Sequence, residues 1–132
     1  MLCMLDTNIC IYLIKRNPHN VVSKLKTYDA GEVAVSAITV AELQYGVQKS
    51  NRPEQNGMAL AEFLLPLEIV AFDERAAGHY GEIRSHLEKT GNIIGSMDLL
   101  IAAHARSLAL TLITNNMSEF RRVPGLRAEN WV

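Results

Sequence analysis

The chain begins with a short apolar run that ends abruptly in polar residues. Met1 to Leu5 are all apolar, and Asp6, Thr7 and Asn8 follow directly. A run of this kind is typical of a strand buried on both faces inside a parallel sheet. Thr7 and Asn8 are good N-caps, and the apolar residues after them predict a helix from Ile9 to Lys15. Asp6 would then lie at the carboxyl end of a buried strand, where ligands bind in open α/β sheets, although capping of the helix alone also explains it.

The same alternation of strand and helix patterns continues along the chain. Apolar or β-branched runs predict strands at 33–38, 67–72 and 110–114, and a last short strand within 126–132. Helical periodicity with proline, glycine and capping signals predicts helices at 19–28, 39–47, 54–65, 73–90 and 97–109, and a turn with a short helix at 115–122. Strands that alternate with helices predict an α/β fold with a mainly parallel central sheet flanked by helices.

The composition fits one well-packed globular unit. The chain has 132 residues, 48% hydrophobic and 20% charged, and we assign residues 1–132 to a single domain. The net charge of -1 gives no global basic field for nucleic acid, so polyanion binding would depend on local clusters. Cys3 and Cys10 lie in apolar runs, which indicates buried thiols in a reducing compartment. No apolar run approaches the roughly 20 residues of a membrane span and no signal peptide is recognisable, so we expect a cytoplasmic protein without membrane contact.

Acidic and amide side chains recur where predicted strands end and helices begin. Glu42 follows the second strand, but with Thr39 it also matches a capping box, in which the glutamate bonds the N-cap amide. Asp98 lies in the first turn of an apolar helix, where the helix dipole stabilises an acid by about 0.3–1 kcal/mol. Asn116 and Glu119 follow the fourth strand, and a plain turn with a solvated acid also explains them. Each position therefore has a structural explanation beside a functional one.

Acids near several strand ends, without a histidine or cysteine constellation, favour a hard divalent cation. The four histidines, His19, His79, His86 and His104, lack the spacing of a zinc site. The chain also lacks a Walker loop, a dinucleotide-binding fingerprint and a serine-hydrolase elbow. Carboxylate oxygens suit Mg²⁺ or Mn²⁺, and an ion held by few protein ligands and several waters typically serves phosphate chemistry.

Six short motifs follow one another along the chain. They are M-L-D-T-N at 4–8, A-E-L at 41–43, G-S-M-D-L-L-I-A-A-H-A at 95–105, T-N-N-M-S-E-F at 114–120, P-G-L at 124–126 and E-N-W at 129–131. This ordered set resembles the PIN-domain ribonucleases, and more closely the VapC toxins of VapBC type II toxin–antitoxin systems. The resemblance covers essentially the whole chain. It implies the PIN-like three-layer fold, with a mainly parallel sheet between two layers of helices.

The resemblance also implies roles for individual residues. Asp6, Glu42 and Asp98 would form the acidic cluster that binds Mg²⁺ or Mn²⁺. PIN domains often carry a fourth acid where this chain has Asn116, which is a departure from the pattern and puts a second metal site in doubt. Glu119 would supply the missing charge, and Asn116 would offer a hydrogen bond or a neutral ligand oxygen. We therefore expect Asp6, Glu42, Asp98, Asn116 and Glu119 to form the catalytic site.

The activity implied by the resemblance is metal-dependent hydrolysis of RNA phosphodiester bonds by an endoribonuclease toxin that inhibits translation. The expected substrate is tRNA, and several relatives cut the anticodon stem-loop of the initiator tRNA. The expected partners are a VapB-type antitoxin and a second copy in a homodimer, within a larger toxin–antitoxin assembly. Candidates for RNA contact, each equally explained as an ordinary solvated side chain, are Lys15, Arg16, Lys49, Arg52, Arg121 and Arg122. Tyr12, Tyr45 and Phe120 are expected in the core rather than as stacking surfaces for bases.

Two other classes of function also fit parts of the pattern. A non-catalytic PIN-like module that only binds RNA or an antitoxin is favoured by Asn116 at the position of an acid. A phosphatase of the haloacid dehalogenase type also begins with a strand that ends in aspartate. That family needs D-x-D, whereas this chain has Asp6-Thr7-Asn8 and no convincing catalytic lysine.

Overall fold

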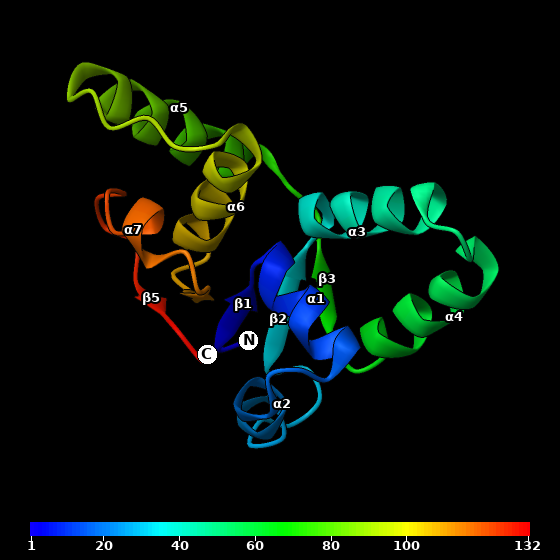
Figure 1. The fold of residues 1–132 in the computed structure, drawn as a ribbon. Coiled ribbons are helices and arrows are strands. Elements are labelled where there is room, and N and C mark those ends of the chain that lie inside the picture. Colours follow the sequence, from blue (N-terminus) through cyan, green and yellow to red (C-terminus); the bar gives the residue numbers. More distant parts are fainter.

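The computed structural model describes all residues from Met1 to Val132 and contains one five-stranded sheet (Figure 1). The strand order is β3-β2-β1-β4-β5, and every neighbouring pair is parallel. This confirms the predicted α/β fold with a parallel sheet. The elements are β1 Cys3–Leu5, α1 Thr7–Lys15, α2 His19–Leu25, β2 Val33–Ser36, α3 Ala37–Lys49, α4 Pro53–Leu64, β3 Glu68–Val70, α5 Glu74–Lys89, α6 Ser96–Ser107, β4 Thr111–Ile113, α7 Met117–Phe120 and β5 Ala128–Glu129.

The apolar run at the N-terminus forms the central strand. Leu5 pairs in register with Val35 of β2 and with Ile113 of β4, so the carboxyl ends of these three strands lie at one edge of the sheet. All three residues of β1 are buried, as the unbroken apolar pattern predicts for a strand covered on both faces. The residues that follow β1, β2 and β4 therefore meet in one place.

Two layers of helices cover the two faces of the sheet. Because strand side chains alternate, Met4, Ala34 and Leu112 pack into one core with residues of α5, α6 and α7. Leu5, Val35 and their same-face neighbours pack into a second core with α1 to α4. Figure 1 shows α5, α6 and α7 on one side of the sheet and α1 to α4 on the other. The three-layer arrangement expected from the resemblance is therefore present.

The starts of three helices differ from the sequence prediction. Asp6, rather than Thr7 or Asn8, is the N-cap of α1, and α6 begins at Ser96 instead of the predicted Met97, with Gly95 as its N-cap. The capping box at Thr39 is wrong, because Ser36 caps α3 and its Oγ accepts a hydrogen bond from the Ile38 amide at 3.0 Å. The polar side chain that ends the preceding strand takes the capping position in α1 and α3. Thr39 and Glu42 consequently lie inside α3 and are free of a capping role.

Other elements are shorter than predicted, while their order is correct. The second helix ends at Leu25 instead of Tyr28, and the third strand covers only Glu68–Val70. Gly91, with φ of 70°, follows the end of α5 as predicted, because glycine adopts this left-handed conformation without strain. Tyr45 is 66% exposed, so its predicted place in the core is wrong, whereas Phe120 is buried. No helix combines the length and the apolar character needed to cross a membrane.

Candidate active site

Asp6 lies at the carboxyl end of the central strand and is almost fully buried. It is 4% exposed, and its Oδ1 accepts a hydrogen bond from the Ile9 amide at 2.8 Å. Its backbone amide donates to the Ile113 carbonyl oxygen at 3.0 Å, which fixes its position between β1 and β4. Burial raises the pKa of the Asp6 carboxyl, and the negative charge of Glu42 contributes to the rise. The capping explanation of Asp6 is therefore correct, but the second carboxylate oxygen is free of that role.

Glu42 reaches the same edge of the sheet from α3. Thr7 Oγ1 donates a hydrogen bond to Glu42 Oε1 at 2.6 Å and lies 3.3 Å from Thr39 Oγ1. Thr7 is the first residue of α1, directly after Asp6. This bond therefore ties Glu42 to the strand end that carries Asp6, across 35 positions of the sequence.

Asp98 lies in the first turn of α6, close to the other acids. Its pKa is raised from 3.8 to about 7, first by burial, then by the neighbouring Glu119 carboxyl, and then by the charges of Asp6 and Glu42. A Cβ atom built at Gly95 would lie 3.4 Å from Asp98 Oδ2 and 3.9 Å from Glu119 Oε1. The glycine thus lets the backbone approach both carboxylates closely. The structure brings Asp6, Glu42, Asp98 and Glu119 within electrostatic reach of one another.

Glu119 completes this group of four carboxylates, which form the acidic pocket, and is held by two hydrogen-bond donors. Its Oε1 accepts a hydrogen bond from the Gly95 amide at 3.0 Å, and its Oε2 accepts one from Asn116 Nδ2. The Gly95 bond is the main reason that the pKa of Glu119 is lowered, and the positive charge of Arg122 adds to the effect. Glu119 is therefore an ionised, positioned carboxylate instead of the solvated side chain of a plain turn.

Asn116 supports Glu119 and does not face the other acids as a replacement carboxylate. Its backbone amide donates to Thr114 Oγ1 at 2.9 Å, which shapes the turn after β4. Its neighbour Asn115 donates through Nδ2 to the Tyr12 hydroxyl at 2.9 Å and so connects this turn to α1. The amide pair thus organises the loop that carries Glu119.

The pocket has the donor set for a hard cation and no internal counter-charge. The ion pairs of the chain join Arg84 to Glu88 and Arg106 to Glu82, and none involves the pocket acids. Ionised carboxylates crowded together repel one another unless a cation compensates them. No three His, Cys, Asp or Glu side chains lie close enough together, as positioned here, to ligate one ion. The oxygen donors therefore fit Mg²⁺ or Mn²⁺ in kind, and ligation needs their side chains to converge further.

Several residues of this site are not identifiable from local sequence patterns. Gly95 contributes its backbone amide, and Tyr12 contributes a hydroxyl that the sequence prediction places in the core. Thr7 bonds Glu42 across 35 positions, so no local pattern links the two residues. The sequence signals for Gly95 are its place before the helix that carries Asp98 and its position as the first residue of the motif at 95–105.

Two of the basic residues expected near RNA have defined positions. Lys49 Nζ lies 5.0 Å from the centre of the exposed Tyr45 ring, one to two turns beyond Glu42 on the same helix. Arg122 Nη1 donates to the Ile93 carbonyl oxygen at 2.9 Å, beside the loop that contains Gly95. Positive charge is thus available on α3 beyond Glu42 and beside the loop that contains Gly95.

These features define an α/β protein with a group of four carboxylates at the carboxyl edge of its parallel sheet. Residues 3–126 match the model of the PIN domain family. The chain is 50% identical to Ribonuclease VapC2 of Haemophilus influenzae over 129 residues, which cover 98% of this chain and 97% of that protein. It is 43% identical to the tRNA(fMet)-specific endonuclease VapC of Shigella flexneri over 128 residues, or 97% of this chain and 96% of that protein.

Solved structures agree with this assignment. The VapBC2 complex of Rickettsia felis, bound to a DNA fragment from its promoter, gives a TM-score of 0.92 at 47% identity, with 100% of both chains covered. DNA-bound VapBC of Salmonella typhimurium gives a TM-score of 0.94 at 41% identity, also over 100% of both chains. The chain therefore belongs to the PIN-domain family, among its VapC proteins.

Proposed function

We propose that this protein is an endoribonuclease toxin that hydrolyses phosphodiester bonds in tRNA and thereby inhibits translation in the cytoplasm. The single observation that carries the proposal is the convergence of Asp6, Glu42, Asp98 and Glu119 at one sheet edge without any ion-pair partner. The names of its relatives, ribonuclease and tRNA(fMet)-specific endonuclease, support the same substrate class.

We infer that the site works with Mg²⁺ or Mn²⁺ held by Asp6, Asp98 and Glu42. A bound divalent cation of this kind lowers the pKa of a coordinated water and offsets negative charge on phosphate oxygens. Glu42, held by Thr7, orients the attacking water from the side of α3. Glu119 and Asn116, bonded to each other, form the opposite rim and fix the loop between β4 and α7.

We propose a VapB-type antitoxin as the regulating partner. A partly apolar cavity of about 270 Å³ between α1, α3 and α4 reaches Glu42 and includes Ile11, Ile14, Leu43 and Ala59 in its lining. Apolar side chains of a partner would fill this cavity, and a basic residue placed beside Glu42 would compete with the cation and with RNA. The Rickettsia felis and Salmonella typhimurium structures are complexes of VapC with VapB, which supports this partner. The resemblance also implies a homodimer, and sedimentation equilibrium should show twice the mass of one chain.

The nuclease is tested by incubating metal-stripped protein with total tRNA, with and without Mg²⁺ or Mn²⁺, and mapping the new RNA ends. We expect one discrete cut that needs both the metal and Asp6. The antitoxin site is tested with Ala59→Glu, which places a charge on the α4 side of the cavity. We expect this variant to cleave tRNA normally and to escape inhibition by a VapB-type antitoxin that inhibits the unmodified protein. Inhibition of both proteins to the same extent would show that the antitoxin binds another surface.

A further inference from the structure

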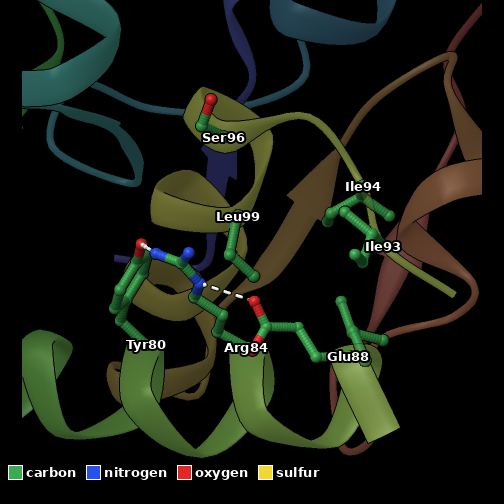
Figure 2. Close-up of a pocket in the computed structure, with 8 residues that line it drawn as sticks. Tyr80, Arg84, Glu88, Ile93, Ile94, Ser96 and Leu99 are labelled. Atoms are coloured by element: carbon green, nitrogen blue, oxygen red, sulfur yellow. Dashed lines mark hydrogen bonds and ion pairs between the residues drawn. The ribbon is translucent and has the colours of Figure 1, made fainter. Parts of the chain in front are cut away.

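A hollow lies between α5, the start of α6 and the loop before α6 (Figure 2). Its volume is about 260 Å³, and its floor consists of the buried side chains of Leu87, Ile94 and Leu99. Ile93 lines the hollow beside these residues and is 64% exposed. The hollow therefore offers a solvent-accessible apolar surface that the fold itself does not cover.

Arg84 is held at the rim of this hollow. Its Nη1 donates to the Tyr80 hydroxyl at 2.9 Å, and its Nε donates to Glu88 Oε2 at 3.2 Å. Figure 2 shows these bonds and shows the guanidinium between Tyr80 and Glu88, on the opposite side of the hollow from Ile93. The side chain is 55% exposed, and neither bond uses Nη2. A positioned guanidinium with free N–H groups is suited to bind a phosphate.

The hollow and the acidic pocket share the loop from Ile93 to Ser96. Ile93 and Ser96 line the hollow, while the Gly95 amide between them donates to Glu119 in the pocket. Arg122 clamps the same loop through the Ile93 carbonyl oxygen, and its charge acts on Glu119. A ligand that spans the loop would therefore contact both sites at once.

We propose that this hollow is a nucleotide subsite, which receives an unpaired nucleotide of the RNA next to the cleaved phosphodiester. The faces of an unpaired base are apolar and pack on Ile93 and the floor of the hollow, while Arg84 binds a phosphate of the same strand. Arg84 at the rim of the hollow and Arg122 beside Glu119 supply the positive charge that an RNA strand needs, and the bond from Arg84 Nε to Glu88 leaves Nη2 free for a phosphate. This inference rests on the proposed ribonuclease function and assigns Arg84 and Ile93 as substrate-positioning residues.

The test measures RNA binding separately from cleavage. Every variant is made in the Asp6→Asn background, and binding of a fluorescein-labelled anticodon stem-loop RNA of the initiator tRNA is followed by anisotropy. Arg84→Gln is compared with Arg75→Gln, a matched loss of charge at an exposed position about 14 Å away along α5. We expect Arg84→Gln to weaken binding about tenfold and to make the slope of log affinity against log salt less negative by about 0.7, while Arg75→Gln changes affinity less than about twofold.

A second experiment identifies the nucleotide whose base enters the hollow. Single abasic nucleotides are introduced along the loop of the same RNA, and Ile93→Asp is tested against each. We expect one abasic position to weaken binding by about tenfold, and we expect Ile93→Asp to remove the sensitivity to that position only. Because Ile93 is 64% exposed, this substitution leaves the core intact.

The outcomes separate this inference from the proposed function. Equal effects of Arg84→Gln and Arg75→Gln, or no abasic position that depends on Ile93, overturn the subsite even if the unmodified protein cleaves tRNA. A change of oligomeric state by Ile93→Asp in ultracentrifugation, with RNA affinity unchanged, also overturns it, because a second copy of the chain then covers the hollow. Binding that depends on Arg84 without any cleavage by the unmodified protein supports the subsite and refutes the nuclease.

Discussion

Replacing Asp98 by asparagine should stabilise the protein at neutral and alkaline pH while abolishing its function. The pKa of Asp98 is about 7 in the folded chain, against an ordinary value of 3.8. A shift of one pKa unit corresponds to 1.36 kcal/mol, so the whole shift would destabilise the folded protein by about 4 kcal/mol when the carboxyl is ionised. Asp98 is only partly buried, so solvent screening reduces this to about 1–2 kcal/mol. Loss of the favourable helix-dipole interaction subtracts about 0.3–1 kcal/mol, which leaves a net gain of about 1 kcal/mol above about pH 7.

The stability difference between Asp98→Asn and the unmodified protein should depend on pH. A carboxyl whose folded pKa is raised binds its proton more tightly in the folded state, so the stability of the unmodified protein falls as pH rises from about 4 through 7. The amide introduced by Asp98→Asn does not titrate, so the difference between the two proteins should be small or reversed near pH 4 and largest near pH 8. Urea unfolding in EDTA at about pH 4, 6 and 8 measures this difference, which includes the relief of the repulsion between Asp98 and the neighbouring acids Glu119, Asp6 and Glu42. A difference that is the same at all three values would refute the electrostatic account of the pocket.

Further predictions concern residues that position, bind or stabilise. Thr7→Val removes the hydrogen bond to Glu42, and we expect tRNA cleavage to fall at least tenfold in kcat with an unchanged circular dichroism spectrum; unchanged kcat would show that Thr7 does not orient Glu42. Tyr45→Ala should change the free energy of unfolding by less than about 0.5 kcal/mol, because the ring is 66% exposed, but should weaken tRNA binding about fivefold in a filter assay; equal binding would exclude stacking on this ring. Arg106→Ala breaks bonds to His79, Glu82 and the Pro124 carbonyl oxygen, so chemical denaturation should show a loss of about 2 kcal/mol with kcat retained at low temperature; a loss of kcat without a loss of stability would contradict this structural role.

The order of the elements and the principal acids could be predicted from the sequence because both depend on local patterns. Asp6 ends an apolar run that is typical of a buried strand, and Asp98 lies at the start of an apolar helix. Parallel strands bring their carboxyl ends to one edge, so acids at these ends meet regardless of the details of packing. This geometry accounts for Asp6 and Glu42, whereas the place of Asp98 in the cluster was implied by the resemblance to the PIN-domain ribonucleases.

The boundary between β2 and α3 could not be predicted, because local preferences there conflict with the tertiary structure. The β-branched Ile38 favours a strand, and the predicted strand extends to it, yet Ala37 and Ile38 lie in α3. Ser36 accepts the Ile38 amide and also lies 2.8 Å from Nδ1 of the buried His104, a contact across 68 positions. A partner so distant in sequence leaves no trace in the local pattern, which therefore extends the strand past Ser36.

The support of the pocket is likewise non-local. The hydrogen bond from Thr7 to Glu42 spans 35 positions, and the one from Gly95 to Glu119 spans 24. Local patterns show that Glu42 and Glu119 are acidic residues near strand ends, but only the folded chain shows which groups hold them. Arg84 and Ile93 lie in no recognisable motif, and their joint hollow exists only because α5 packs against α6 (Figure 2).

The most direct test of the central claim is cleavage of tRNA by metal-stripped protein and by its Asp6→Asn variant, each with and without added Mg²⁺ or Mn²⁺. The account predicts a single mapped cut in one tRNA, present only for the unmodified protein with added metal, and a variant that remains folded and binds the same RNA. Equal cleavage by Asp6→Asn, or no cleavage by folded, antitoxin-free protein under any of these conditions, would contradict the assignment of the acidic pocket as a metal-dependent ribonuclease site.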